Sequence, residues 1–334
     1  MTPAQSSRSE STARQARLRA LLVGSPWLGP LIALLAVYCL FAALTPDTFL
    51  LGVNLVTMVR QTVVVGVAAV GMTLVMVAGG IDLSVGSLVA LTTVVIAADM
   101  RSGGGPLRAL SLALLVSAVA GLVNGALVAS LRITPFIVTL GTMSVLRGTA
   151  KGLASEQKID VDPHGLDQLM AFVPRELGWM LLPPGVWMAL AVGALAAVFL
   201  RYMYMGRHIV AMGSNPLTAR LCGVPVSRLT VAVYAIAGLL SGLAGLLEFS
   251  TLTVGDPTDS IGLELEVIAA VVIGGGSLSG GQGSVAGSLF GALLLTVIKT
   301  GCTHVGLANW VQEILTGVII VVAMGLDRLR QRGR

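Results

Sequence analysis

Residues 63–98 read VVVGVAAVGMTLVMVAG, GIDL and SVGSLVALTTVVIAA in direct succession, and Asp82 is the only charged side chain among them. A helix needs about 17–25 apolar residues to cross roughly 30 Å of hydrocarbon. In lipid the backbone must satisfy its hydrogen bonds internally, which a helix does within one segment. Two apolar runs joined by four residues therefore predict membrane helices with a short break between them.

The same composition extends over the whole chain. Its 334 residues are 55% hydrophobic and 11% charged, whereas about 25% of the residues of a soluble domain are charged. A net charge of +5 would raise the question of nucleic acid in a soluble protein. Cytoplasmic loops of membrane proteins also collect Lys and Arg, which explains the excess better. We therefore expect a lipid membrane around the chain and no nucleic-acid partner.

Charged residues, Gly and Pro divide the chain into separate apolar runs. We predict an all-α polytopic membrane protein with about ten transmembrane helices, some of them short. The predicted spans are residues 27–45, 63–79, 84–98, 109–131, 134–146, 180–200, 229–247, 267–273, 284–298 and 310–326.

Charge asymmetry predicts the orientation of these spans. Arginines gather in residues 1–26 and in residues 328–334, so both termini are predicted to be cytoplasmic. The acid-rich loops 151–178 and 248–266 are predicted to be external, and the basic loop 202–228 to be cytoplasmic. Residues 27–327 then form one transmembrane domain. A signal peptide is the alternative for the first run, but its length and the lack of a small-residue cleavage site favour a retained helix.

Two glycine-rich segments interrupt the helical pattern at membrane depth. Unpaired backbone is tolerated there only where it is buried in protein or lines a cavity, so we predict broken or re-entrant helices along the translocation pathway. Their candidate residues are Gly79, Gly80, Asp82 and Ser84 in the first segment and Gly274, Gly275, Gly276 and Ser277 in the second. Aligned with Gly79 on Gly274, both segments also share Leu-Ser, which indicates either a weak internal repeat or a chance similarity.

Residues 278–282 read Leu-Ser-Gly-Gly-Gln, the signature sequence of ABC-type ATPases. ATP hydrolysis also needs a phosphate-binding G-x-x-x-x-G-K-[ST] loop, and none of Lys151, Lys158 and Lys299 stands in one. We therefore interpret the pentapeptide as a glycine-rich helix break and expect no catalytic residue. The cysteines and histidines are scattered without metal-ligand spacing, so we expect neither a metal nor a cofactor.

The predicted cytoplasmic loop contains the capping signals of a short helix. Asn215 is a good N-cap, Pro216 suits the first turn and Gly223 suits the C-terminal stop. These signals predict a helix of about two turns outside the membrane. It is either an ordinary surface helix or a lever that transmits movement from a docked partner into the spans.

Four motifs together resemble the ribose/xylose/galactose permease branch of bacterial ABC importers. In chain order they are AGGIDLSVGS (78–87), TPFIVTLGTM (134–143), GSNPLTARLCGV (213–224) and VIGGGSLSGG (272–281). The resemblance extends over residues 48–327. The chain departs from the family at Leu217-Thr218-Ala219, where the family often has a paired Ala-Ala.

The resemblance implies a permease subunit of the bacterial inner membrane that translocates a monosaccharide, either a ribose-like pentose or a hexose. It implies three protein partners: a cytoplasmic ABC ATPase, a periplasmic sugar-binding protein, and a second permease copy that is identical or similar. It also identifies the 213–224 loop as the coupling helix that docks on the ATPase. The corresponding residues here are Gly213, Asn215, Pro216, Ala219, Arg220 and Gly223.

Asp82 has two interpretations. A buried acid in a membrane span is a functional candidate by default, and it would suit an ion-coupled secondary transporter of a small polar solute, the alternative function. Its position just before a new helix also suits capping together with Ser84, which we favour. A membrane enzyme or scaffold is a weaker alternative, since no catalytic cluster stands out in the sequence.

Other residues of the spans have structural interpretations. Lys299 and Arg147 lie near predicted outer ends, where long side chains reach the interface. Gly121 and Gly238 belong to glycine rows that predict close helix packing. Only 4% of the chain is aromatic, and no single span combines the carboxylate and amide groups that bind sugars. The sequence thus indicates no substrate-contacting residue.

Overall fold

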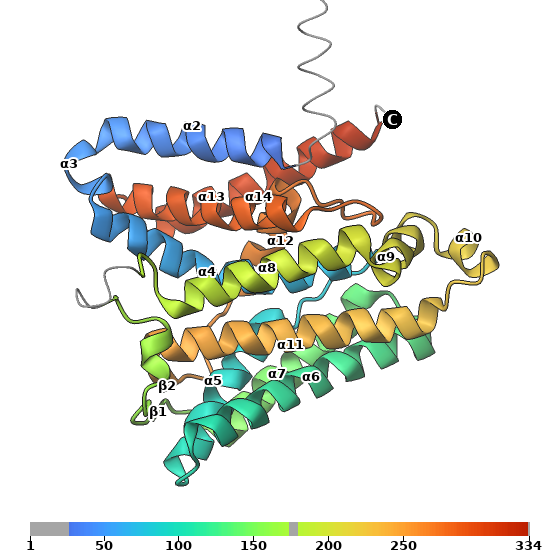
Figure 1. The fold of residues 1–334 in the computed structure, drawn as a ribbon, viewed down its shortest axis with the longest axis horizontal. Coiled ribbons are helices and arrows are strands. Elements are labelled where there is room, and N and C mark those ends of the chain that lie inside the picture. The colour runs from blue at the N-terminus through green and yellow to red at the C-terminus, as the bar shows by residue number, and fades with distance from the viewer. Residues whose placement is uncertain (1–26, 174–179, 333–334) are drawn as a thin grey trace, which may run out of the picture.

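A computed structural model describes residues 27–173 and 180–332 of the chain, so the predicted basic segment 1–26 and the last two residues lie outside the described part. Helices and one small sheet make up its regular structure (Figure 1). In chain order the elements are α2 (Leu28–Leu44), α3 (Pro46–Phe49), α4 (Gly52–Val77), α5 (Val85–Arg101), α6 (Pro106–Leu131), α7 (Pro135–Leu153), β1 (Ile159–Asp160), the 3-10 helix η1 (Leu166–Leu169), α8 (Pro184–Tyr202), α9 (Tyr204–Ser214), α10 (Pro216–Leu221), α11 (Val226–Leu252), β2 (Val254–Gly255), α12 (Leu263–Ile273), α13 (Val285–His304) and α14 (Asn309–Arg332).

Each predicted span overlaps one of these helices. Within the described residues, five helices are long and apolar enough to cross a membrane, namely α4, α6, α8, α11 and α13. A polytopic all-α membrane protein is therefore confirmed. The crossing of the remaining helices stays a prediction, as does the cytoplasmic position of both termini.

Several helices extend beyond their predicted spans, and the start of α4 shows the largest difference. Helix α4 begins at Gly52 rather than at residue 63, because polar side chains lower the hydropathy of its first turns without ending the helix. One of them, Arg60, places its guanidinium 4.2 Å from the centre of the Phe172 ring and so packs against protein. Helix α9 was not predicted, since only α10 was expected in the loop 202–228.

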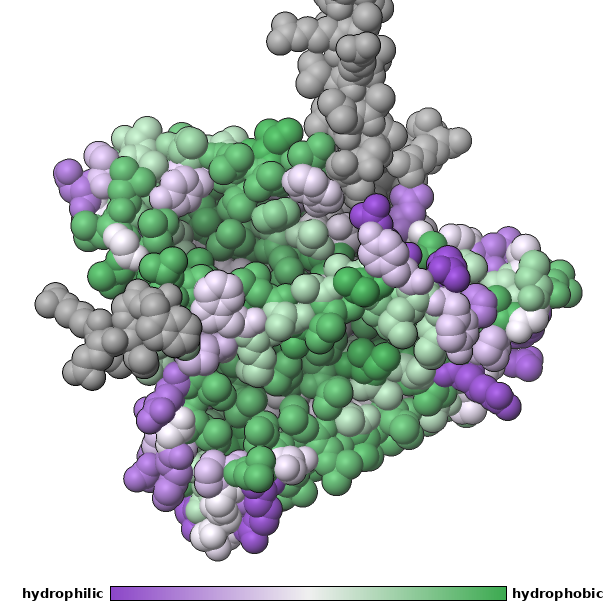
Figure 2. Space-filling model, viewed as in Figure 1, coloured by the Kyte–Doolittle hydropathy of each residue, from purple (hydrophilic) through white to green (hydrophobic). Residues whose placement is uncertain are grey.

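The surface has the distribution that a lipid environment requires. Figure 2 shows apolar residues in a broad band across the molecule, with hydrophilic residues concentrated at its two ends. Large apolar side chains project from the outer helices, among them Leu35 of α2, Leu115 of α6 and Leu195 of α8, which are 54%, 61% and 71% exposed. In water such a surface would drive aggregation, whereas in lipid it is the expected exterior.

Glycine rows bring neighbouring helices into backbone contact, as the sequence predicts. A Cβ atom built on Gly121 of α6 would lie 2.9 Å from the Cα of Gly238 on α11. On α13, a Cβ built on Gly291 would lie 2.9 Å from the carbonyl carbon of Ala270 on α12. These distances are too short for any side chain, so the prediction of close packing is confirmed.

The two acidic loops meet at one end of the molecule. Strands β1 and β2 pair antiparallel, with Ile159 opposite Gly255, and the Lys158 Nζ lies 3.0 Å from an Asp256 carboxylate oxygen. Burial alone would raise the pKa of Asp256, but hydrogen bonds from Thr258 and the ion pair with Lys158 outweigh it and hold that pKa below its usual value. Both loops therefore lie on the same side of the membrane, in agreement with the orientation predicted from charge.

Arg147 of α7 is also part of this end. Its Nη1 donates hydrogen bonds to the backbone carbonyls of Pro257, at 3.0 Å, and Asp259, at 2.6 Å. Arg147 thus reaches the loop before α12 and holds it, while its extension to the membrane interface stays a prediction. Helices α9 and α10 lie at the opposite end of α11 from the strands (Figure 1).

Candidate translocation and coupling site

Helix α10 has the capping pattern that its sequence predicts. The Asn215 side chain accepts a hydrogen bond of 2.9 Å from the Thr218 N–H, and Pro216 occupies the first turn. Gly223 follows the helix with φ at +84°, a left-handed conformation that favours glycine. The short helix therefore begins and ends where its own residues dictate.

One side of α10 is anchored and the other is open. Ala219 is buried and belongs to a cluster with Met212 and Leu229, which ties α10 to α9 and to the first turn of α11. Leu217 and Leu221 are 68% and 81% exposed, and Arg220 is also exposed. Two exposed leucines beside an arginine form a surface suited to another protein, at the end of the molecule away from the strands.

Both glycine-rich breaks begin with the same helix ending. After α4, the N–H of Gly79 bonds to the Met76 carbonyl and that of Gly80 to the Val75 carbonyl. After α12, Gly275 and Gly276 repeat these bonds, and φ is +86° at Gly79 and +89° at Gly275. This is the Schellman pattern, in which a left-handed residue closes the helix.

The repeated ending changes the alignment of the two breaks. The left-handed glycine shows that Gly79 corresponds to Gly275, so the alignment of Gly79 with Gly274 is wrong by one residue. Helix α12 has 11 residues and is about 16 Å long, too short for roughly 30 Å of hydrocarbon. The second break therefore begins within the depth of a membrane.

Asp82 stabilises the turn that leads into α5. The side chain is fully buried, and its Oδ1 accepts hydrogen bonds from the Ser84 N–H at 2.8 Å and the Ser84 hydroxyl at 2.6 Å. The Asn124 amide donates to the same hydroxyl at 2.9 Å. Ser84 is the N-cap residue of α5, but among the described residues no side chain makes a cap hydrogen bond to that helix; Asp82 instead closes an Asx turn onto Ser84.

Three segments that are distant in sequence meet at glycine backbones. A Cβ built on Gly280 would lie 2.6 Å from the Gly213 carbonyl oxygen and 2.8 Å from the Gly79 Cα. The Gly281 N–H donates a hydrogen bond of 2.9 Å to the Val77 carbonyl. We call the contact of Gly79, Gly213 and Gly280 the glycine junction.

The glycine junction accounts for the Leu-Ser-Gly-Gly-Gln pentapeptide. Gly280 belongs to it and Gly281 is its neighbour, and both lie in the turn between α12 and α13, where they pack against α9 and the end of α4. The pentapeptide is thus a helix break, as its flanking sequence predicts. Gly213 is the second-last residue of α9, so the junction lies immediately before α10.

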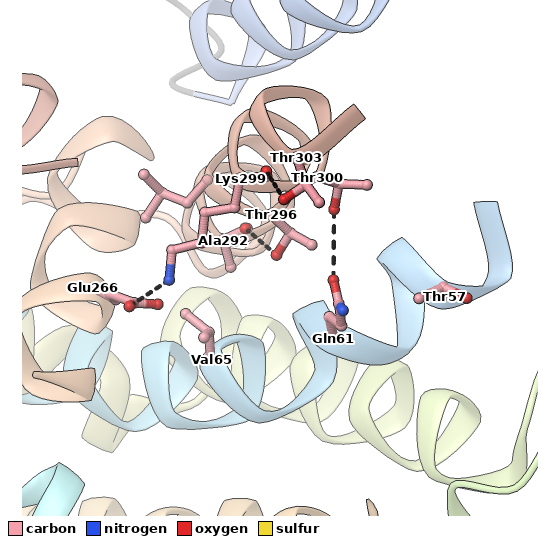
Figure 3. A pocket seen from close by; sticks show the side chains of 10 residues that line it. Thr57, Gln61, Val65, Glu266, Ala292, Thr296, Lys299, Thr300 and Thr303 are labelled. Carbon is pink, nitrogen blue, oxygen red and sulfur yellow. Dashed lines mark hydrogen bonds and ion pairs between the residues drawn. The ribbon is translucent and has the colours of Figure 1, made fainter. Parts of the chain in front are cut away.

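A polar pocket lies between α4, α12 and α13, toward the end of the molecule that carries the strands. Its volume is about 330 Å³. The lining residues are Thr57, Gln61, Val65, Glu266, Ala292, Leu295, Thr296, Lys299, Thr300 and Thr303. Figure 3 shows Lys299 pointing toward Glu266, and Gln61 facing Thr300.

Two polar contacts cross this pocket. The Lys299 Nζ lies 2.5 Å from a Glu266 carboxylate oxygen, and the Thr300 hydroxyl lies 3.5 Å from the Gln61 side-chain oxygen. Lys299 is therefore paired within the protein, and its expected extension to the interface stays a prediction. The sequence does not reveal this pocket because its polar groups come from three helices, although the spacing of Thr296, Thr300 and Thr303 places them on one helix face.

Comparison with known proteins identifies relatives over nearly the whole chain. The family model "Branched-chain amino acid transport system / permease component" matches residues 54–324. The chain is 38% identical over 303 residues to the ribose import permease of Escherichia coli (strain K12), covering 90% of this chain and 93% of the relative. It is 31% identical over 316 residues to the fructose import permease of Rhizobium meliloti, covering 93% and 88%. No solved structure matches the chain.

Proposed function

Because this chain belongs to the family of transport-system permease components that includes the ribose and fructose import permeases, we propose that it translocates a monosaccharide across the bacterial inner membrane, driven by a separate cytoplasmic ABC ATPase. The chain itself is a transport subunit and not an enzyme. The names of its relatives give no support to the ion-coupled alternative. Ribose is the first substrate to test, since the ribose import permease of Escherichia coli is 38% identical to this chain.

The observation that carries the proposal is the position of α10. The helix exposes Leu217 and Leu221 at one end of the bundle, and it follows directly on the glycine junction, where both glycine-rich breaks meet α9. A partner that binds α10 and moves it would displace Gly213, and with it the backbones of Gly79 and Gly280. In our proposal ATP-driven closure of the ATPase subunits acts through this contact.

The candidate pathway residues supply the turns about which the broken helices can move in such a mechanism. Gly79 and Gly275 end the two broken helices, and Asp82 with Ser84 keeps the turn before α5 in place. Rigid half-helices joined by glycine turns reorient as units, because the turns absorb the change in backbone angle. We propose that movement at the two breaks opens the sugar path alternately to each side.

Three further parts of the assembly belong to the proposal. A second permease copy completes the membrane unit, and a periplasmic sugar-binding protein delivers the substrate to the end that carries β1 and β2. Both termini and α10 are cytoplasmic. The basic composition of residues 1–26 and 328–334 and the acidic composition of the opposite loops support this orientation.

Reconstitution tests the proposed function. The chain is co-expressed with a candidate ABC ATPase and sugar-binding protein from the same organism, and the complex is placed in liposomes with ATP inside the compartment that α10 faces. We expect ribose uptake that requires ATP and persists when a protonophore dissipates the proton gradient. The purified chain alone should hydrolyse no ATP. Uptake that survives ATP depletion but not the protonophore would refute the proposal.

A further inference from the structure

The polar pocket between α4, α12 and α13 extends inward from the strand-side ends of these helices. Gln61 is nine residues after the first residue of α4, and Thr296 is eight residues before the last residue of α13. At 1.5 Å per residue both lie about 12–14 Å along their helices, whereas Glu266 is three residues after the first residue of α12, about 5 Å along it. The floor of the pocket, at Val65, Ala292 and Thr296, lies within the predicted spans 63–79 and 284–298, and its opening faces the end that carries the strands.

Lipid is an unsuitable occupant for this pocket. The Lys299 and Glu266 side chains are 39% and 27% exposed in spite of their ion pair. A charged group costs roughly 2.5–3.5 kcal/mol or more in the hydrocarbon region, so such groups line water-filled cavities. The pocket thus contains water or a polar solute. Its volume of about 330 Å³ falls in the ~300–1,000 Å³ range of small-molecule sites.

The hydrogen-bonding groups of the pocket are mainly acceptors. Thr57, Thr296 and Thr303 each donate their hydroxyl proton to the carbonyl four residues earlier, at 2.9, 3.2 and 3.0 Å. The Thr57 and Thr296 oxygens keep lone pairs that accept a proton from a ligand, and the Thr303 oxygen already accepts one from the Gln312 amide at 3.2 Å. The Glu266 carboxylate adds further acceptor positions, while its charge is balanced by Lys299.

This set of groups fits an uncharged polyol better than an amino acid. Sugar hydroxyls donate protons to threonine and carboxylate oxygens and accept them from the Gln61 amide and the Lys299 ammonium. The carboxylate of an amino acid would instead need a free cation, and the one cation lining the pocket, Lys299, is already paired with Glu266. Val65, Ala292 and Leu295 supply an apolar wall against which C–H groups of a sugar ring can pack.

We propose that this pocket is a binding station for the monosaccharide on its way through the permease, with Gln61, Glu266 and Lys299 as its principal hydrogen-bonding groups. The inference rests on the proposed function. It goes further by assigning substrate contact to this chain, in addition to recognition by the binding protein. The three residues lie on three different helices, so movement of α12 relative to α4 and α13 would assemble or disperse the site.

Transport kinetics of the full complex test this assignment. Gln61→Leu and the double variant Glu266→Gln with Lys299→Met keep approximate side-chain volume while removing hydrogen-bonding capacity or charge. We expect each to lower the transport rate at limiting sugar by at least tenfold, with ATPase subunits and the second permease still bound. Lys151→Met and Thr251→Val are the matched controls, because both residues lie outside the pocket lining. The Thr251 hydroxyl donates to the carbonyl four residues earlier at 2.9 Å, as the hydroxyls of three pocket threonines do.

A labelling experiment covers the case in which the variants fail to fold. Cys39, Cys222 and Cys302 are replaced by Ala, and a single cysteine is introduced as Thr300→Cys or, as a control, Thr251→Cys. We expect saturating ribose to slow reaction of a thiol reagent at position 300 severalfold but not at position 251.

Each outcome of the two experiments is decisive. Wild-type ribose uptake combined with unchanged kinetics in the pocket variants would overturn the pocket assignment and leave the proposed function intact. Equal protection at positions 300 and 251 would do the same. Absence of ATP-dependent sugar uptake by the wild-type complex would overturn both proposals. Protection by a branched-chain amino acid but not by sugars would overturn the choice of substrate class.

Discussion

Substitution of Gly213 by alanine tests the glycine junction most directly. A Cβ at this position would overlap the Val77 carbonyl oxygen and lie 2.7 Å from the Gly281 nitrogen. These two atoms form the 2.9 Å hydrogen bond that joins the second break to the end of α4. The methyl group must therefore separate α9 from both breaks or displace that bond.

The expected change in the free energy of unfolding is the sum of two unfavourable contributions and one favourable contribution. Overpacking of a tight contact costs about 1–3 kcal/mol, and loss of a backbone hydrogen bond costs about 0.5–1.5 kcal/mol. Alanine offsets up to about 1 kcal/mol through its higher helix propensity. We expect Gly213→Ala to lower the free energy of unfolding by about 1–3 kcal/mol. Gly148 of α7 is the matched control, because its Cβ would meet nothing within 4 Å, so Gly148→Ala should be neutral or slightly stabilising.

The assay combines stability with coupling. Unfolding of the purified variants by denaturant gives the difference in free energy, and liposomes containing the complete transporter give the number of sugars carried per ATP hydrolysed. We expect Gly213→Ala to retain ATPase binding and hydrolysis but to carry at least fivefold fewer sugars per ATP. If Gly213→Ala matches Gly148→Ala in both stability and coupling, the glycine junction transmits nothing and the reasoning is refuted.

Three further predictions concern separate contacts. Leu221→Asp on α10 should weaken binding of the ATPase subunit at least tenfold in a co-purification assay. The fold should be unchanged, since Leu221 is 81% exposed. Arg207→Ala on α9 is the control, and equal ATPase binding by the two variants would contradict the docking role of α10. Asp82→Asn should keep an acceptor for the Ser84 N–H and retain ATP-driven uptake, whereas Asp82→Ala should lose about 1 kcal/mol of stability; loss of uptake in a folded Asn variant would exclude a purely structural role. Asp256 has a pKa below its usual value of about 3.9, so its stabilisation of the β1–β2 contact is complete above that value and lost as pH falls through the lower, folded pKa. The protection factor of the Ile159 amide, its intrinsic exchange rate divided by the observed rate at the same pH, should therefore be constant from pH 7 to about pH 4.5 and fall below about pH 4, with the fall moved to higher pH in Lys158→Met.

Much of the fold can be predicted from the sequence because its signals are local. A helix in lipid satisfies its own backbone, so apolar runs predict the spans, and caps such as Asn215 and Gly223 act within one turn of α10. Polar residues that have partners inside the protein make the predicted span shorter than the actual helix. Arg60 packs on Phe172, which lets α4 begin earlier than its hydropathy indicates.

In the candidate site, too, features with local signals could be predicted from the sequence and long-range contacts could not. The sequence by itself determined a polytopic helical membrane protein, its two glycine-rich breaks and the short capped helix α10, because each depends on neighbouring residues. Only the tertiary structure decided that Gly79, Gly213 and Gly280 touch, and that Gln61, Glu266 and Lys299 share one pocket. Such contacts depend on how helices pack across long sequence separations. The physical reason is that packing in a membrane is specified by shape and a few polar pairs, which leave little periodic signal in the chain.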